Sequence, residues 1–146
     1  MKTINEWMAK DHDRLDALFQ KFISAKKEDL PTAKQVFVEF KRGLERHIMW
    51  EEEILFPIFE GRTGMHASGP TQIMRLEHEQ IKGFLEEIND KLAKEITVAD
   101  SLQRDLFDLL KMHNDKEEGI LYPWIDQVAS KKELEEIINY IRPAIE

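Results

Sequence analysis

The sequence predicts an all-α protein, an antiparallel up-down-up-down four-helix bundle with a short C-terminal helix. Apolar residues recur every three or four positions over long stretches, which is the spacing of one helix face, and no stretch alternates like a half-buried strand. The second half of the chain also repeats features of the first half at a constant shift of 66 positions. Two similar helical hairpins suit a symmetric bundle.

The first predicted helix covers residues 3–24 and begins at a capping box formed by Thr3 and Glu6. A second, longer helix is predicted over residues 32–59, after a charged break that ends in a proline. Pro57 falls near the end of this helix, where a kink costs little stability. These two helices form the first hairpin.

A glycine-rich loop over residues 61–70 separates the two halves. The second hairpin is predicted from helices over residues 71–95 and 98–127, with Thr97 as the N-cap of the latter. A tail helix over residues 131–142 carries one apolar face, which we expect to pack on the bundle rather than bind a second subunit or another partner.

Composition limits the classes of function. A chain of 146 residues with 42% hydrophobic residues is expected to form one domain, residues 1–146. The net charge of −8 disfavours nucleic acid and anionic membranes as partners, because both require a basic face. No cysteine is present, so thiolate metal sites and thiol catalysis are excluded. With no secretory or membrane-spanning pattern, we expect a cytoplasmic protein.

Four of the five histidines form two pairs related by the shift of 66 positions, and one glutamate accompanies each pair. These candidate metal ligands are His12, His47 and Glu51 in the first half, and His78, His113 and Glu117 in the second. In each hairpin the predicted turn lies midway between the two histidines, so the bundle brings all six side chains to one level. The histidine and glutamate of each long helix are four residues apart and therefore share one face.

A set of four imidazoles and two carboxylates suits iron, manganese or zinc better than calcium or magnesium. By the symmetry of the halves, we expect His12 and His47 to serve one metal, and His78 and His113 the other. The two glutamates would bridge the metals. Coordination positions then remain for a bridging oxygen and an exogenous ligand.

Over residues 3–127 the pattern resembles the hemerythrin-like family, also called the HHE cation-binding domain. The resemblance rests on the single histidines of the first and third helices and on the segments 47–51 and 113–117. It implies a non-haem di-iron centre with an oxo or hydroxo bridge, for which manganese or zinc are possible substitutes. It also implies a small ligand, namely dioxygen, peroxide or nitric oxide, and an unidentified redox partner.

Two departures narrow the function that the resemblance implies. The oxygen carriers of the family have a His-x3-His pair on the third helix, whereas Met74 precedes His78 by four residues here. The ligand set is closest to the di-iron domain of bacterial iron-centre repair proteins, but those carry an additional cysteine-bearing segment. Storage or delivery of iron, iron-centre repair, and an iron- or oxygen-responsive interaction module therefore stay open as alternatives.

Several further residues were considered for the site. Glu52 and Glu118 either orient imidazoles or face water, whereas Asp11 and Glu77 are not counted in the site. His66 has no counterpart under the shift and is expected to be exposed. Most aromatic residues are expected to pack in the core, although Tyr122 could border the ligand pocket: Phe19, Phe22, Phe40, Trp50, Phe56, Phe84, Tyr122 and Trp124.

Overall fold

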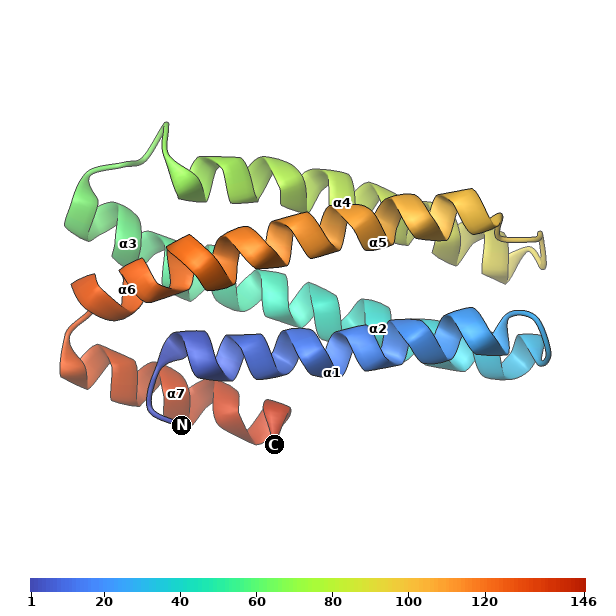
Figure 1. Ribbon diagram of the computed structural model, residues 1–146, viewed down its shortest axis with the longest axis horizontal. Helices are drawn as coiled ribbons and strands as arrows, with labels where there is room; N and C mark the ends of the chain where they lie inside the picture. Colours follow the sequence, from blue (N-terminus) through green and yellow to red (C-terminus); the bar gives the residue numbers. More distant parts are fainter.

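Four long antiparallel helical segments form the predicted bundle, in a computed structural model that describes residues 1–146 (Figure 1). Helices α1 (Ile4–Ala25) and α2 (Leu30–Trp50) make the first hairpin. Helices α4 (Pro70–Ala93) and α5 (Asp100–Lys116) make the second. The two helices of each hairpin pack against one another, and α2 also packs against α4. The all-α fold class is confirmed.

Two of the four segments contain a π-helical turn that the sequence analysis did not predict. In each segment a long α-helix continues through this wider turn into a short α-helix. The elements are the turn Glu51–Leu55 (η1) followed by α3 (Phe56–Thr63), and the turn Glu117–Leu121 (η2) followed by α6 (Tyr122–Val128). Both turns begin at a candidate bridging glutamate, and π-turns inside α-helices are frequent at functional sites.

A proline follows each π-turn, at Pro57 and Pro123. Proline lacks an N–H group, and in a regular helix its ring collides with the carbonyl group four residues earlier. The wider π-turn carries a hydrogen bond from Phe56 N–H to the carbonyl of Glu51, and one from Tyr122 N–H to the carbonyl of Glu117. The long helices therefore continue past their prolines, to Thr63 and Val128.

The helix starts follow local capping. The predicted capping box of Thr3 and Glu6 is present at α1. The prediction that Thr97 caps the fourth long helix is wrong, because the N-cap residue is Ala99, without a side-chain cap. Lys26, the C-cap residue of α1, donates to the carbonyl of Val98 at 2.6 Å, so the chain stays extended there and the helix starts later.

Helix α7 (Lys131–Ile145) starts at a capping box of Ser130 and Glu133, and it continues past the predicted end at residue 142. Its apolar residues Ile137, Ile141 and Ile145 are buried, and the helix packs along α1. The expected packing of this helix on the bundle is therefore confirmed. None of the helices combines the length and the apolar character that a bilayer-spanning segment needs.

The apolar core is split into two clusters along the bundle. One lies toward the interhelical turns of both hairpins and includes the tilted ring pairs of Phe19 with Phe40 and of Phe22 with Phe37. The other gathers residues from the opposite end of the bundle, including Trp50 and Phe59. The candidate ligands lie between the two clusters, so apolar layers shield them from water along the bundle axis.

Replacing a fully buried core residue tests this division. Phe37→Ala should lower the free energy of unfolding by about 3–5 kcal/mol, because Phe37 has no exposed surface and its loss leaves a cavity. Met112→Ala, at a side chain that is 64% exposed, should change it by less than about 0.5 kcal/mol. Urea denaturation of both variants checks this. Equal losses in the two variants would contradict the assigned core.

Candidate metal centre

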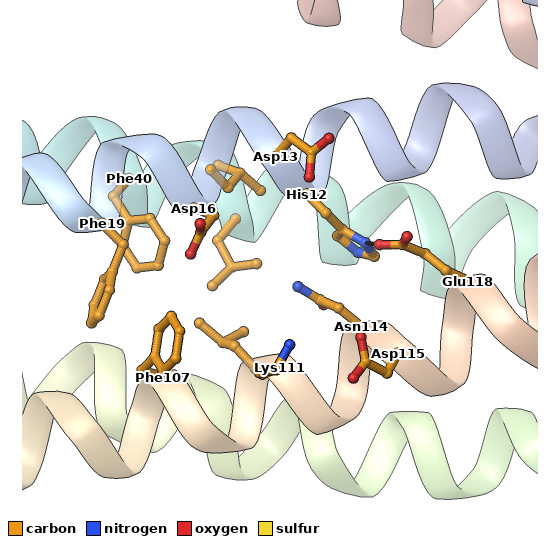
Figure 2. Close-up of a pocket in the computed structure, with 13 residues that line it drawn as sticks. His12, Asp13, Asp16, Phe19, Phe40, Phe107, Lys111, Asn114, Asp115 and Glu118 are labelled. Carbon is orange, nitrogen blue, oxygen red and sulfur yellow. Dashed lines mark hydrogen bonds and ion pairs between the residues drawn. The ribbon is translucent and has the colours of Figure 1, made fainter.

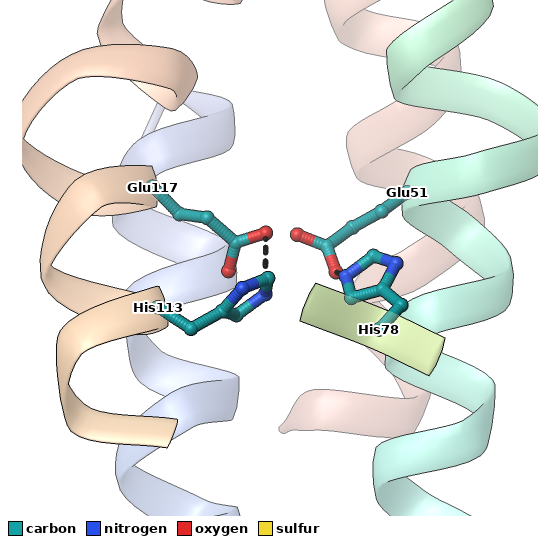
Figure 3. Close-up of side chains that lie close together, drawn as sticks. All are labelled: Glu51, His78, His113 and Glu117. Atoms are coloured by element: carbon teal, nitrogen blue, oxygen red, sulfur yellow. Dashed lines mark ion pairs between the residues drawn. The ribbon is translucent and has the colours of Figure 1, made fainter. Parts of the chain in front are cut away.

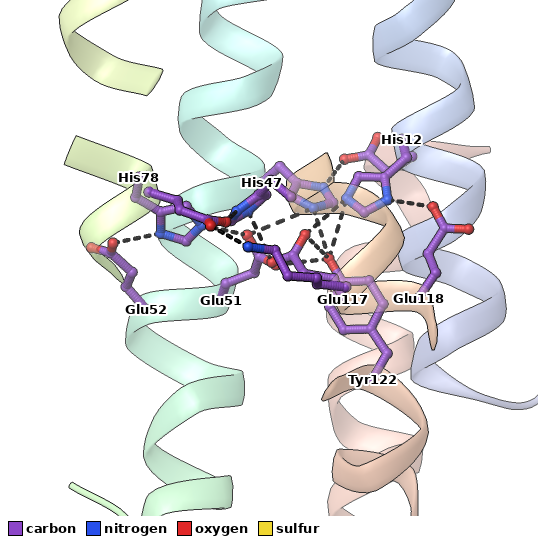
Figure 4. A network of polar contacts seen from close by, with 12 residues as sticks. His12, His47, Glu51, Glu52, His78, Glu117, Glu118 and Tyr122 are labelled. Atoms are coloured by element: carbon purple, nitrogen blue, oxygen red, sulfur yellow. Dashed lines mark hydrogen bonds and ion pairs between the residues drawn. The ribbon is translucent and has the colours of Figure 1, made fainter. Parts of the chain in front are cut away.

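The six predicted site residues come together in the interior, contributed by all four long segments (Figures 3 and 4). None is more than 5% exposed, and His78, Glu51 and Glu117 have no exposed surface. The two hairpin turns and the glycine-rich loop therefore bring the ligand-type side chains to one level, as their spacing predicts.

The six side chains divide into two overlapping groups. His78 and His113 converge with Glu51 and Glu117, each offering one possible ligand atom within 4.8 Å of the others (Figure 3). The second group, with the same spacing, consists of His12, His47 and Glu117. His12 thus lies with His47, and His78 with His113; Glu117 belongs to both groups and Glu51 to the second pair's group.

All four imidazoles are oriented in the same way, each by a separate carboxylate at its Nδ1 atom. A carboxylate can only accept, so each Nδ1 carries the proton and each Nε2 is left to bind a metal. The pairs are His12 with Glu118 at 2.7 Å, His47 with Asp11 at 2.8 Å, His78 with Glu52 at 2.7 Å, and His113 with Glu77 at 2.8 Å. The shift of 66 positions relates these orienting carboxylates as well.

The orienting carboxylates differ in their own surroundings. Asp11 is fully buried and accepts from Arg14 Nε at 2.8 Å, and Glu77 forms an ion pair with Lys116. Glu118, by contrast, is 38% exposed. Two imidazoles are therefore held by carboxylates that a cation fixes in place, whereas His12 is held by one that meets solvent.

Tyr122 lies at the centre of the site, because the π-turn brings the residue five positions after Glu117 onto the same helix face. Its hydroxyl donates to Glu51 Oε2 at 2.7 Å and lies 3.1 Å from Glu117 Oε1. The same oxygen is 3.1 Å from His47 Nε2 and 3.3 Å from His12 Nε2. The phenol is therefore part of the cluster and does not merely border it.

Unpartnered polar atoms provide a test of whether this cluster suits a metal. Glu51 Oε1, His78 Nε2 and Glu117 Oε2 are buried without a hydrogen-bond partner. Glu51 Oε1 and His78 Nε2 are 3.2 Å apart but are not aligned as donor and acceptor. Buried unpaired polar atoms are costly and rare in native proteins. Three such atoms converging on one point fit a cation-binding site, and the donor set fits borderline metals.

The two buried carboxylates influence each other. Burial and the neighbouring Glu117 raise the pKa of Glu51. Burial also acts to raise the pKa of Glu117, but the charge of His113 and hydrogen bonds with Glu51, His113 and His12 hold it well below its ordinary value. Burial, followed by the charges of Glu117 and Glu51, raises the pKa of Tyr122 well above its ordinary value.

The imidazoles respond to the same charges in the absence of metal. Burial disfavours the charged form of His12, but Glu117 and Glu118 outweigh it and raise the pKa of His12 to about 10. Burial likewise opposes protonation of His78, whereas Glu51 and Glu52 raise its pKa to about 9. The pKa of His113 is raised in the same way. Protons therefore supply the positive charge that the carboxylates need, and metal binding must displace them.

A cavity of about 240 Å³ lies between α1 and α5 and reaches the cluster at His12 and Glu118 (Figure 2). Phe19, Phe40 and Phe107 line its apolar end. On the corresponding seam of the other half, between α2 and α4, Ile48 is buried where the shift of 66 positions has the cavity-lining Asn114. The cavity thus gives solvent access to the cluster on the side of His12.

The sequence analysis left out two of the orienting residues, Asp11 and Glu77. The signal that could have identified them is the shift itself, because it relates these two as it relates Glu52 to Glu118. Glu52 and Glu118 do orient imidazoles, which decides between the two roles considered for them. The remaining histidine, His66, is exposed as expected.

Comparison with known proteins agrees with the geometry. The family model of the hemerythrin HHE cation binding domain matches residues 3–125. The chain is also 29% identical over 133 residues to an uncharacterized hemerythrin-like protein of Schizosaccharomyces pombe. That alignment covers 91% of this chain but 64% of the relative, so the chain spans less than two thirds of that protein's length. No solved structure matches the chain.

Removing the charge behind one imidazole should weaken metal binding. Asp11→Asn keeps a side chain of similar shape but no longer stabilises positive charge on His47, so affinity for ferrous iron should fall roughly 10- to 100-fold. Asp108→Asn, at an exposed position that lies in neither the cluster nor the cavity wall, is the matched control and should leave the affinity unchanged. Competition with a chromogenic chelator measures both. An equal loss in the two variants would remove the assigned role of Asp11.

Stability of the metal-free chain should depend on pH through the histidines. The raised pKa values of His12 and His78 mean that their protonated forms stabilise the fold, fully below the ordinary value of 6.5. This contribution is lost as pH rises through about 9 and about 10. With metal bound the sign reverses, because protons compete with the metal as pH falls.

Melting curves of metal-free protein across this pH range check the expectation. The double variant His12→Gln/His78→Gln should lose much of the alkaline decline in melting temperature. The His66→Gln control changes an exposed histidine and should behave like the parent chain. A decline of equal size in all three proteins would show that other groups cause it.

Proposed function

The chain belongs to the hemerythrin HHE cation-binding family, and on this basis we propose that it is a non-haem di-iron protein that binds or reacts with dioxygen, peroxide or nitric oxide. The observation that carries the proposal is the buried cluster of four oriented imidazoles and two carboxylates with unpartnered ligand-type atoms. Manganese or zinc could occupy the same donor set. A cytoplasmic location and a separate redox partner remain predictions from the sequence.

In this proposal His12 and His47 hold one iron, and His78 and His113 hold the other. Glu51 and Glu117 lie between the two pairs and would bridge the metals. When bound, an iron pair supplies a redox-active centre that can take up a small oxidising or gaseous ligand. The orienting carboxylates fix the imidazoles and increase their basicity, which favours metal retention.

The surroundings of the cluster support a small ligand. The two apolar clusters exclude water along the bundle axis. The cavity between α1 and α5 connects the solvent side to His12 through an apolar wall that includes Phe19 and Phe107. Such a passage suits a small uncharged molecule better than an anion, because Asp13 and Asp16 also line it.

One observation favours storage or delivery of iron as a second candidate function. Glu118, which orients His12, is 38% exposed and borders the cavity. A ligand residue whose orienting partner meets solvent would release metal to a chelator or acceptor more readily than one held by buried Asp11. Lability of a single metal position would therefore favour iron handling over ligand activation.

Iron loading under anaerobic conditions, followed by exposure to each small molecule, tests the proposal. We expect two irons per chain, and an absorption spectrum that changes with at least one of oxygen, peroxide and nitric oxide. Two irons that ignore all three and leave easily under chelation would favour iron handling. Absence of iron binding, or binding of zinc alone, would overturn the di-iron proposal.

A further inference from the structure

The two halves of the site differ at one position that the shift of 66 residues makes equivalent. Phe56 stacks on His78, with ring centroids 5.7 Å apart and an interplanar angle of 10°. Its counterpart Tyr122 stacks on His12, also at 5.7 Å, with an angle of 29°. The same ring thus occupies the same place in both halves, and one half adds a hydroxyl group.

The added hydroxyl is directed at one pair of histidines. Its oxygen is 3.1 Å from His47 Nε2 and 3.3 Å from His12 Nε2, and it also lies within 3.1 Å of oxygens of Glu51 and Glu117. A single O–H group donates one hydrogen bond, which Glu51 Oε2 receives at 2.7 Å. Four ligand-type atoms therefore surround one phenol oxygen, and only one of them receives its proton.

The spacing of these atoms matches that of neighbouring ligands on one ion. Imidazole nitrogens and carboxylate oxygens bind first-row metals at about 2.0–2.2 Å, so two ligands at a right angle lie about 3 Å apart. The Tyr122 oxygen shows separations of 2.7 to 3.3 Å from the four surrounding atoms. It lies where a further ligand of the His12 and His47 metal would lie.

We propose that Tyr122 is itself a metal ligand, whose phenol oxygen binds the metal held by His12 and His47. This inference rests on the proposed di-iron function. On binding, the O–H bond breaks, the oxygen keeps the electron pair that it gives to the metal, and the proton is released to solvent. A nearby cation provides the positive charge that this requires.

The two metal positions are then unequal although the halves are duplicated. The position at His12 and His47 has a phenolate oxygen as an additional protein ligand. The position at His78 and His113 has the apolar ring of Phe56 in the corresponding place. An anionic oxygen donor favours ferric over ferrous iron, so the first position is the one that holds ferric iron more strongly.

The chain has two tyrosines, which makes the test direct. Ferric iron bound to a phenolate gives a visible charge-transfer band, and resonance Raman excitation within that band enhances tyrosine ring vibrations. Iron-loaded parent protein and the Tyr140→Phe control, at a residue that is 61% exposed on α7, should both show these vibrations. Tyr122→Phe should lose them while still binding two irons per chain, since the other half holds a phenylalanine there.

Two further measurements keep the test independent of how one variant folds. Ring-deuterated tyrosine incorporated into the parent chain should shift the enhanced vibrations without any substitution. Phe56→Tyr should add a second phenol and increase the intensity of the band. Parent protein that binds two irons but shows no tyrosine vibrations would overturn the ligand role of Tyr122 and leave the di-iron function intact. Failure to bind iron would overturn both.

Discussion

Burial of six ionisable side chains at one level of the bundle is the constraint on which the rest of the structure depends. Charged groups are seldom stable in an apolar interior unless they are paired or bind a metal. Here Glu51 and Glu117 lie within an interior closed by apolar clusters on both sides. Positive charge must come either from protonated imidazoles or from bound metal, and this requirement links protonation, folding and metal binding.

The orienting carboxylates follow from the same constraint. An imidazole that presents Nε2 to the centre must satisfy Nδ1 elsewhere, and each of the four does so with a carboxylate from a neighbouring helix. These contacts tie α1 to α2 and α4 to α5 within the hairpins. They also join the hairpins, through Glu52 to His78 and Glu118 to His12. The interactions that orient the ligands therefore also stabilise the bundle.

Much of this arrangement could be predicted from the sequence because it depends on spacing. The positions of His12 and His47 about the first turn, and of His78 and His113 about the second, are enough to bring them to one level. Asp11 and Glu77 escaped prediction because acidic residues beside a histidine on a helix face solvent in most proteins. Periodicity gives the phase of a helix but not which neighbouring helix a polar side chain will reach.

The π-turns could not be predicted from the sequence, for a related reason. Regular helical spacing places residues four positions apart on one face, so an uninterrupted α-helix would turn Tyr122, five positions after Glu117, away from Glu117. The extra residue in each π-turn changes that phase. The only sequence feature that marks each π-turn is the proline that follows it, at equivalent positions in the two halves. By themselves, however, they predict a kink or a helix end, not a wider turn.

Comparison of the two duplicated halves also shows which positions are the same in both and which differ. The candidate ligands and the orienting carboxylates follow the shift of 66 positions, so both histidine groups have the same kinds of donor. Tyr122 and its counterpart Phe56 differ in chemistry. So do the cavity-lining Asn114 and its buried counterpart Ile48. The two histidine groups therefore share Glu117, but only the His12 group borders the cavity between α1 and α5.

Anomalous diffraction at the iron absorption edge, from crystals of iron-loaded protein, tests the paired site most directly. Two peaks are expected inside the bundle, one beside His12 and His47 and the other beside His78 and His113, with Glu51 and Glu117 between them. A single peak, or peaks confined to the surface while the interior side chains stay unligated, would contradict the paired metal site.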